Sequence, residues 1–331
     1  MTKRHFLHQI DKICVISETC PPKEEPTLYH VETNQTNQMH SPQTNNRIIT
    51  GVDIGGSHIT VCLVDLHKQL VIEGSELRHH INSSGTADEV IASWAAPIIE
   101  ANHRNGFQPS RIGIAMPGPF DYEKGISLIK GLAKYEHLYG LNVKELLADA
   151  LSTKAADIRM VNDATAYLIG EHQLGSGKGA ASVLGITLGT GFGSAWHMHG
   201  QLTDGDLYRF PFRDGVAEDY VSTRWLLKAY AGQAGIAMES VLAMSEAARS
   251  GDAVAMNVFR QLGEALGEII LQRFSPALPE RVVVGGNIAR SAELFVPYAE
   301  RVIRDAGFET GIVTAVLGEQ AALIGAACLW E

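Results

Sequence analysis

Two glycine-rich turns carry the side-chain and backbone groups best suited to chemistry in this chain. Residues 53–58 read DIGGSH and residues 187–194 read TLGTGFGS. Because glycine has no Cβ, the backbone N–H groups of such turns can approach a phosphate closely. Two turns facing each other would hold the phosphates of a nucleotide from both sides, which indicates phosphoryl transfer. The candidate phosphate-binding residues are Asp53, Gly55, Gly56 and Ser57 in the first turn and Gly189, Thr190, Gly191 and Gly193 in the second.

An Asn-Asp pair lies between these turns in the sequence. Asn162 and Asp163 follow a short apolar segment and open a helical pattern, which would place the Asp163 carboxylate at the floor of a cleft. In phosphoryl transfer to an alcohol, a carboxylate can accept the hydroxyl proton while acceptor and phosphate are held in line. The alternative is that either residue only caps the helix. A cap and a base are compatible, and with the two glycine turns we interpret Asp163 as a general base.

Asp53 ends a strand just before the first glycines, where its carboxylate could hold Mg²⁺ through water. The alternative is an Asp that only forms the turn. Ser57 and His58 could donate hydrogen bonds to phosphate oxygens. The second turn is not a dinucleotide fingerprint, because its spacing is Gly-x-Gly-x-Gly and a strand pattern follows it, whereas the fingerprint is Gly-x-Gly-x-x-Gly opening a helix.

Alternating strands and helices are needed to position these residues. Short β-branched apolar segments flank the first turn at 48–53 and 59–64 and precede the second turn, which is typical of strands. We expect further strands near 69–77, 111–116, 158–161, 281–284 and 312–314, and helices near 86–103, from 162 or 163, 223–230, 238–248, 254–274, after 287 and from 319. A hairpin followed by a helix occurs in both halves, which indicates two similar α/β domains with a cleft between them. We place them at 47–175 and 176–331, with the last helix packing back on the first domain.

Composition narrows the class of protein. A chain of 331 residues that is 45% hydrophobic can bury a large core and form two domains. A formal net charge of −10 argues against nucleic acid or an anionic membrane as the main partner. No apolar run approaches the roughly 20 residues of a membrane helix. Four cysteines without metal-binding spacing fit a reducing, cytoplasmic setting. The oligomeric state stays open, with a homodimer as the candidate.

The first 46 residues differ from the rest. Residues 33–46 are rich in Asn, Gln and Thr, which bury little apolar surface, so we expect residues 1–46 to be a weakly ordered tail. A helix-turn-helix that reads DNA would need two periodic helices, and Pro21-Pro22 with the Asn/Gln-rich tract leaves no room for them.

The motifs together resemble the ROK family of sugar kinases, within the actin/hexokinase/Hsp70 ATPase superfamily. The matching segments are 53–58, the Pro-Gly-Pro at 117–119, Asn-Asp-Ala at 162–164, 189–193 and Gly-Gly-Asn at 285–287. The resemblance covers about 48–330 and implies two actin-like (ribonuclease H-like) α/β domains around a central cleft. It also implies ATP-dependent phosphorylation of a hexose, as in the glucokinases. It assigns Gly285, Gly286 and Asn287 to the adenosine side and Gly118 to substrate binding.

On the sugar side the chain departs from the family. The family has Gly-Glu-x-Gly-His followed by a cysteine cluster that holds zinc, whereas residues 205–209 here read GDLYR. No cysteine lies between Cys62 and Cys328, so we expect no structural zinc, as in the zinc-free members. Asp206 and Arg209 could replace the family's Glu and His, or both could be solvated loop charges. Glu218 resembles a family Glu that contacts the sugar, and Asn162, Asp163 and Glu218 would together bind hexose hydroxyls.

The sequence therefore predicts an ATP- and Mg²⁺-dependent hexose kinase. One alternative is a non-catalytic sugar-binding regulator, which the missing DNA-binding segment and the intact Asn162-Asp163 pair disfavour. Another alternative is a kinase that takes polyphosphate as donor, for which an exposed groove of Lys and Arg would be expected. The sequence leaves the sugar unnamed.

Overall fold

Two mixed β-sheets organise the protein. The computed structural model describes residues 47–331, and the expected tail at 1–46 lies outside the described residues. The first sheet contains β1 (Ile48–Ile54), β2 (His58–Asp65), β3 (Leu70–Val71), β4 (Leu77–His80), β5 (Ile112–Met116) and β8 (Ile158–Asn162). The second sheet contains β9 (Val183–Leu188), β10 (Phe192–Met198), β11 (Gln201–Gly205), β14 (Arg281–Gly285) and β15 (Gly311–Thr314). Small hairpins join β6 (Phe120–Asp121) to β7 (Ile126–Ser127) and β12 (Pro211–Phe212) to β13 (Gly215–Val216).

The two sheets share one topology. In the first, β1 pairs antiparallel with β2 and parallel with β5, which pairs parallel with β8. In the second, β9 pairs antiparallel with β10 and parallel with β14, which pairs parallel with β15. The glycine turns are thus the hairpins β1–β2 and β9–β10. This repeat is the one that the sequence pattern predicted, and the α/β fold class is confirmed. The predicted boundary between 175 and 176 falls in the connection before β9, and we retain it as a proposal.

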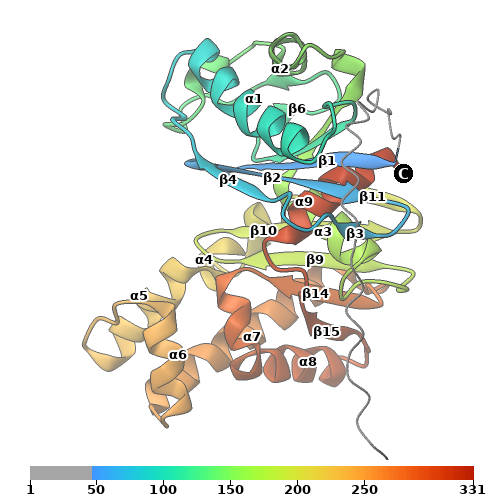
Figure 1. The fold of residues 1–331 in the computed structure, drawn as a ribbon. Helices are drawn as coiled ribbons and strands as arrows, with labels where there is room; N and C mark the ends of the chain where they lie inside the picture. The colour runs from blue at the N-terminus through green and yellow to red at the C-terminus, as the bar shows by residue number, and fades with distance from the viewer. Residues whose placement is uncertain (1–46) are drawn as a thin grey trace, which may run out of the picture. The chain divides into compact units, whose positions relative to one another are not determined.

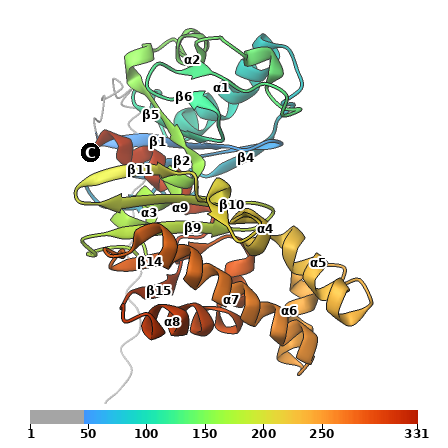
Figure 2. The ribbon, with the colours of Figure 1, turned by 180° about the vertical axis from the view of Figure 1, so that it is seen from behind.

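Helices form layers around and between these sheets (Figures 1 and 2). α1 (Ala87–Arg104) and α2 (Val143–Leu151) cover the outer face of the first sheet, and α7 (Ala253–Phe274) and α8 (Val296–Asp305) cover the second. α3 (Asp163–Gln173) and α9 (Gln320–Ala327) lie between the sheets, whereas α5 (Thr223–Ala234) and α6 (Val241–Arg249) project to one side. The remaining short elements are α4 (Glu218–Val221), η1 (Glu136–Leu138), η2 (Ala155–Asp157), η3 (Leu207–Arg209), η4 (Asn287–Leu294) and η5 (Cys328–Trp330).

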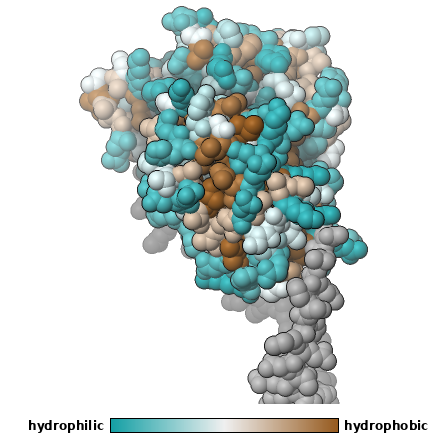
Figure 3. Space-filling model, turned by 90° about the horizontal axis from the view of Figure 1, so that it is seen from above, coloured by the Kyte–Doolittle hydropathy of each residue, from teal (hydrophilic) through white to brown (hydrophobic). Residues whose placement is uncertain are grey.

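Apolar side chains on both faces of the first sheet explain this layering. Val52, Ile54 and their neighbours on one face pack with α1 and α2, around the fully buried Trp94. Ile49 and Val64 on the other face pack with α9. The outer surface seen from above in Figure 3 also carries apolar side chains grouped among hydrophilic ones.

Small residues let α9 lie directly against its neighbours. A Cβ on Gly325 would overlap the Ala166 carbonyl oxygen of α3, and one on Gly113 would overlap the Ala326 carbonyl oxygen. The small residues of α9 therefore make a close helix contact with α3. In this arrangement the last helix packs on β1 and β5 of the first sheet, which brings the start of α9 to the first glycine turn.

The expected helices are present, and α1 begins at a complete capping box formed by Thr86 and Glu89. The continuous strand expected at 69–77 is wrong, because β3 and β4 are separate strands. Gly74 has a φ of 73°, and the Ser75 hydroxyl donates to the Ile72 carbonyl at 2.6 Å, so the chain turns between them. The sequence analysis also missed α2, although Asn142 caps it and its apolar residues recur at helical spacing. Between residues 47 and 331, no helix has the length and apolar character needed to cross a membrane.

Candidate active site

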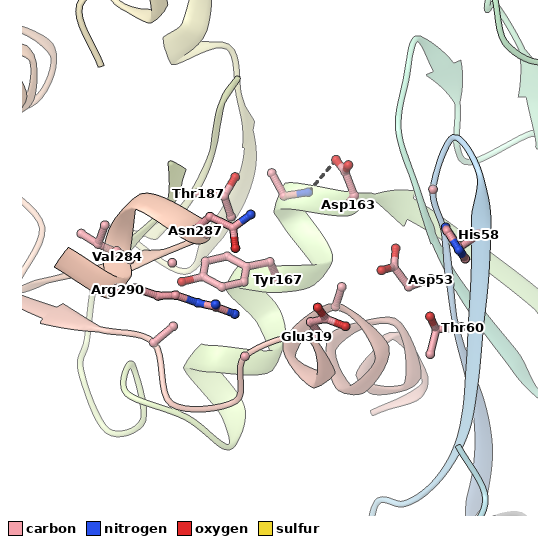
Figure 4. A pocket seen from close by; sticks show the side chains of 18 of the residues that line it. Asp53, His58, Thr60, Asp163, Tyr167, Thr187, Val284, Asn287, Arg290 and Glu319 are labelled. Atoms are coloured by element: carbon pink, nitrogen blue, oxygen red, sulfur yellow. Dashed lines mark hydrogen bonds between the residues drawn. The ribbon is translucent and has the colours of Figure 1, made fainter. Parts of the chain in front are cut away.

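A cleft of about 1000 Å³ brings together residues that are far apart in the sequence. Its lining comes from the β1–β2 turn, the start of α3, the residues after β14 and the segment that leads into α9. Figure 4 shows the arrangement of the labelled side chains, with Asp53, His58 and Thr60 on one side, Thr187, Val284, Asn287 and Arg290 on the other, and Asp163, Tyr167 and Glu319 between them. The cleft is therefore shared by both sheets and by the two helices between them.

The first glycine turn faces this cleft with open backbone. The Gly55 N–H donates to the His58 carbonyl at 2.9 Å, which closes the turn, and the Tyr135 hydroxyl donates to the Gly55 carbonyl. A Cβ at Gly55 or Gly56 would meet no non-neighbouring heavy atom closer than 3.5 Å. Glycine at these positions therefore leaves space beside the backbone, as the approach of a phosphate requires, and does not relieve an internal clash.

Ser57 and His58 also line the cleft. The Ser57 hydroxyl lies 2.9 Å from His58 Nδ1, and His58 Nε2 lies 3.1 Å from Nε2 of His80, its cross-strand neighbour on β4. The His58 ring is thus held by neighbouring side chains on both of its nitrogens.

The sequence left open whether Asn162 and Asp163 cap a helix or face the cleft, and in the structure each residue does one of the two. Asn162 Oδ1 accepts the N–H groups of Ala164 at 2.9 Å and Thr165 at 3.4 Å, so Asn162 is the N-cap of α3. Asp163 is the first helical residue, accepts one bond from the Ala164 N–H at 2.8 Å, and faces the cleft (Figure 4). Burial raises the pKa of Asp163, and that backbone bond opposes the shift. The cap therefore does not depend on Asp163, whose carboxylate is available for chemistry.

Asp53, the penultimate residue of β1, lies on the opposite side of the cleft. Burial raises the pKa of Asp53 to about 6, the negative charge of Asp163 adds to the rise, and the charge of Arg78 opposes it. Two carboxylates in a partly dehydrated cleft repel each other, and a cation placed near them would relieve that repulsion. The environment of Asp53 therefore suits a bound cation.

The second glycine turn lies at the edge of the cleft lining and does not form part of it. Thr187 before it lines the cleft, whereas Gly189, Thr190, Gly191 and Gly193 are not part of the cleft lining. A Cβ at Gly193 would overlap the Thr187 hydroxyl, so this glycine is required by packing.

Glu218 braces that turn. Its Oε2 accepts the Phe192 N–H at 3.0 Å, and its Oε1 lies 3.6 Å from the Arg224 guanidinium. The residue that resemblance assigns to the sugar thus holds the backbone of the β9–β10 turn in this structure.

The third predicted segment, Gly285, Gly286 and Asn287, lines the cleft opposite the first turn. Gly286 has a φ of 84°, and a Cβ there would overlap the Leu188 carbonyl oxygen. A Cβ on Gly285 would meet the Tyr167 hydroxyl at 2.5 Å. Glycine at both positions lets β14 end against β9 and α3.

A polar cluster lies beside Asn162. Its Nδ2 donates to the Tyr122 hydroxyl at 3.3 Å, and that hydroxyl donates to the Met116 carbonyl at 3.0 Å. A Cβ on Gly118 would come within 3.1 Å of the same hydroxyl, so Gly118 belongs to this cluster. The group adjoins Asp163 through Asn162, but none of its residues is part of the cleft lining.

Asp204 is a residue of this region that the sequence analysis missed. Its Oδ1 accepts the hydroxyl of Thr165, two residues after Asp163, at 3.0 Å. Burial raises the pKa of Asp204, and the charges of Asp206 and Asp163 add to the rise. The signal that could have found it is the register of the β10–β11 hairpin, which sequence spacing alone does not reveal.

Asp206 directly precedes η3, Arg209 is the last residue of η3, and their side chains pair at 3.3 Å. Their side chains are 70% and 65% exposed, and neither lines the cleft. In this structure they match the alternative of solvated loop charges.

No group of three or more His, Cys, Asp or Glu side chains within residues 47–331 is arranged to hold a metal ion. The single carboxylate of Asp53 fits Mg²⁺ that is coordinated mainly by water and phosphate oxygens, which is the usual preference of this ion.

Comparisons with known proteins agree with this geometry. The ROK family model matches residues 49–207 and 213–331. A glucokinase of Thermotoga maritima is 27% identical, with 85% of this chain and 96% of the relative covered. An N-acetyl-D-glucosamine kinase of Salmonella paratyphi B is 26% identical over 77% of this chain and 88% of the relative. A crystal structure of a ROK family glucokinase from Streptomyces griseus with glucose and AMPPNP superposes with a TM-score of 0.66 at 24% identity, covering 85% of this chain and 98% of that one.

The likeness to the solved structure shows that the two sheets with α3 and α9 between them form the actin-like two-domain fold of the ROK sugar kinases. The family model extends over nearly all the described residues. The chain belongs to the ROK family.

Proposed function

We propose that this ROK-family carbohydrate kinase transfers the γ-phosphoryl group of Mg-ATP to a hydroxyl of a hexose or hexose derivative, with Asp163 as general base. The observation that carries the proposal is the division of roles at the start of α3. Asn162 caps the helix, so the partly buried Asp163 carboxylate faces the cleft opposite the open backbone of the first glycine turn. A carboxylate and an open glycine turn that face each other across one cavity support these two roles.

The chemistry follows from that placement. Asp163 accepts the proton of the sugar hydroxyl as the hydroxyl oxygen bonds to the γ-phosphorus and the bond from that phosphorus to the bridging oxygen breaks, which releases ADP. Bound Mg²⁺ would neutralise part of the charge on the phosphates. Asp53 would orient the hydrated ion, while backbone N–H groups at Gly55, Gly56 and Ser57 bind phosphate oxygens.

We assign the adenosine end of ATP to the opposite wall of the cleft. Gly285, Gly286 and Asn287 line that wall, and Arg290 from η4 points into the cavity (Figure 4). Gly189, Thr190, Gly191 and Gly193 would reach the phosphates only if the two halves close further, since they lie outside the lining of the cleft in this structure. Closure on the sugar would also exclude water, so that the sugar and not water accepts the phosphoryl group.

We assign the sugar to the polar cluster beside Asp163. Asn162 and Asp163 with the Tyr122 hydroxyl and the Asp204 carboxylate offer donors and acceptors for adjacent hydroxyl groups. Glycine at position 118 lets the Tyr122 hydroxyl lie close to the backbone there. Glu218 would join only by releasing the Phe192 N–H, and Asp206 and Arg209 only by separating from each other.

The test is release of ADP from Mg-ATP in the presence of glucose, mannose, fructose, N-acetylglucosamine or N-acetylmannosamine. We expect turnover with at least one of these sugars and a lower KM for it in the wild type than in Asp204→Asn. Binding of nucleotide and sugar without turnover on any sugar would contradict the kinase proposal and favour a sugar-binding regulator.

A further inference from the structure

A lysine that the sequence analysis did not single out lies beside the first glycine turn. Lys134 lies in the connection between β7 and α2, and its side chain is half-buried. Its Cδ lies 3.9 Å from the position that a Cβ on Gly56 would occupy. The aliphatic part of Lys134 therefore runs beside the open backbone of the proposed phosphate-binding turn.

The residues around Lys134 hold it in this position. The Glu136 carboxylate accepts the N–H groups of Leu132 at 2.8 Å and Ala133 at 3.1 Å. On the other side, the N–H of the fully buried Tyr135 donates to the Ser83 carbonyl at 2.7 Å, and its hydroxyl donates to the Gly55 carbonyl. The connection is thus fastened to the first glycine turn itself.

The backbone on both sides of Lys134 adopts an uncommon conformation. Ala133 has a φ of 54° and Tyr135 a φ of 55°, in the left-handed region that non-glycine residues seldom adopt. Each such residue costs about 1 kcal/mol or more, and such costs tend to persist where a side chain must be presented at a functional site. The hydrogen bonds of Glu136 and Tyr135 offset this cost.

The charge of the Lys134 ammonium group acts on the proposed base, and among the described residues no carboxylate pairs with this group. Its charge acts on Asp163 and lowers the pKa of that carboxyl, against the effect of burial. In the described part of the chain, no carboxylate lies within 4.0 Å of the Lys134 ammonium. By contrast, the nearby Lys124 in the β6–β7 hairpin pairs with Asp121 at 3.2 Å. A half-buried cation that lies beside the proposed phosphate-binding turn and acts electrostatically on the proposed base is thus available to a ligand.

We propose that the Lys134 ammonium group contacts the γ-phosphoryl group of bound ATP, between the Gly55-Gly56 backbone and Asp163. The inference rests on the proposed function and adds a catalytic residue to it. Negative charge on the equatorial oxygens of the transferring group is stabilised by a fixed cation in a partly dehydrated site. Lys134 takes no part in the proton transfer, because Asp163 accepts the proton of the sugar hydroxyl.

The direct test is nucleotide binding, measured by calorimetry with Mg²⁺ for AMP-PNP and for ADP. Lys134→Met keeps the length of the side chain and removes its charge. We expect about a 10- to 100-fold weaker affinity of this variant for AMP-PNP and an ADP affinity within about 2-fold of wild type, because only AMP-PNP carries the γ-position. Lys134→Arg, which restores the charge, should recover most of the AMP-PNP affinity.

Lys130→Met is the matched control, because Lys130 lies in the same connection, is exposed and lies over the Tyr139 ring at 5.1 Å. It should change neither affinity. Equal losses for AMP-PNP and ADP in Lys134→Met, or no loss for either, would overturn the inference. If the wild type and variants show the expected pattern but no sugar is phosphorylated, the γ-phosphate contact stands and the proposed function fails.

Discussion

At the scale of residues, the site depends on two carboxylates that the fold holds in an unfavourable environment. Asp53 and Asp163 come from different elements, and burial raises the pKa of each above its ordinary value. Part of the rise at Asp53 comes from the charge of Asp163. The free protein therefore bears an electrostatic cost at neutral pH, which bound Mg²⁺ and the phosphates would relieve together.

This cost predicts that Asp53→Asn raises the free energy of unfolding of the protein while it impairs catalysis. The folded pKa of about 6 lies above the value of 3.8 for a free carboxyl, so ionised Asp53 lowers the free energy of unfolding, and the penalty grows as the pH rises from 3.8 through 6. Without Mg²⁺, the variant should be more stable by about 1–3 kcal/mol at pH 7 and by less than about 1 kcal/mol near pH 4, measured by urea unfolding. Asp149→Asn on α2, which is exposed, is the control. An Asp53→Asn protein no more stable than wild type at pH 7 would contradict the electrostatic account.

The sequence could locate those site residues whose positions depend on the residues next to them in the chain. Asp53, Gly55, Gly56 and Asp163 follow directly from strand ends, and the cleft brings them together. Asp204 and Lys134 were missed because a hairpin register and the backbone conformation of a long connection decide where they point, and neither can be read from local spacing. Asp206 and Arg209 illustrate the opposite error. They occupy positions of a family motif, but their side chains are exposed and pair with each other outside the cleft.

At the scale of elements, α3 and α9 lie between the two sheets, and α3 carries the proposed base, Asp163. Their contact needs residues without side chains, because a Cβ on Gly170 would overlap the Ala321 carbonyl oxygen and one on Gly325 would overlap that of Ala166. The small-residue pattern of α9 permits this contact. The pattern could not show that the helix lies on β1 and β5, because a helix of small apolar residues has no polar face to orient it.

We expect Gly325→Ala to destabilise the protein by about 2–4 kcal/mol, because the added methyl group forces α9 away from α3. Gly232→Ala in α5 is the matched control, since no non-neighbouring heavy atom lies within 4 Å of its Cβ position. That change should stabilise the protein by up to about 1 kcal/mol through helix propensity. Both values can be measured by denaturant unfolding, and similar effects of the two changes would argue against the close packing of α9.

At the scale of the whole molecule, the charge balance bears on the phosphoryl donor. The chain carries a formal net charge of −10, and Arg78 at the cleft is paired with Glu319 at 2.8 Å. A long polyanion would meet this field along its whole length, whereas Mg-ATP presents only a few charges that the cleft can neutralise.

Initial rates with one sugar can compare Mg-ATP with polyphosphate as the phosphoryl donor. We expect kcat/KM for Mg-ATP to exceed that for polyphosphate, counted per chain, by at least about 10-fold at low ionic strength. Added salt should narrow the gap, because it screens the repulsion of the polyanion. Equal or better use of polyphosphate would show that a basic track on this molecule outweighs its net charge.

The most direct test of Asp163 as general base is a single-turnover measurement with excess enzyme and Mg-ATP labelled at the γ-position. Wild type should convert the label into sugar phosphate. Asp163→Asn should do so at least ~100-fold more slowly, while it binds nucleotide and sugar and unfolds at a similar denaturant concentration. Asn can keep the 2.8 Å bond from the Ala164 N–H but cannot accept the hydroxyl proton. A folded Asp163→Asn protein that transfers the label at a rate close to that of wild type would contradict the mechanism.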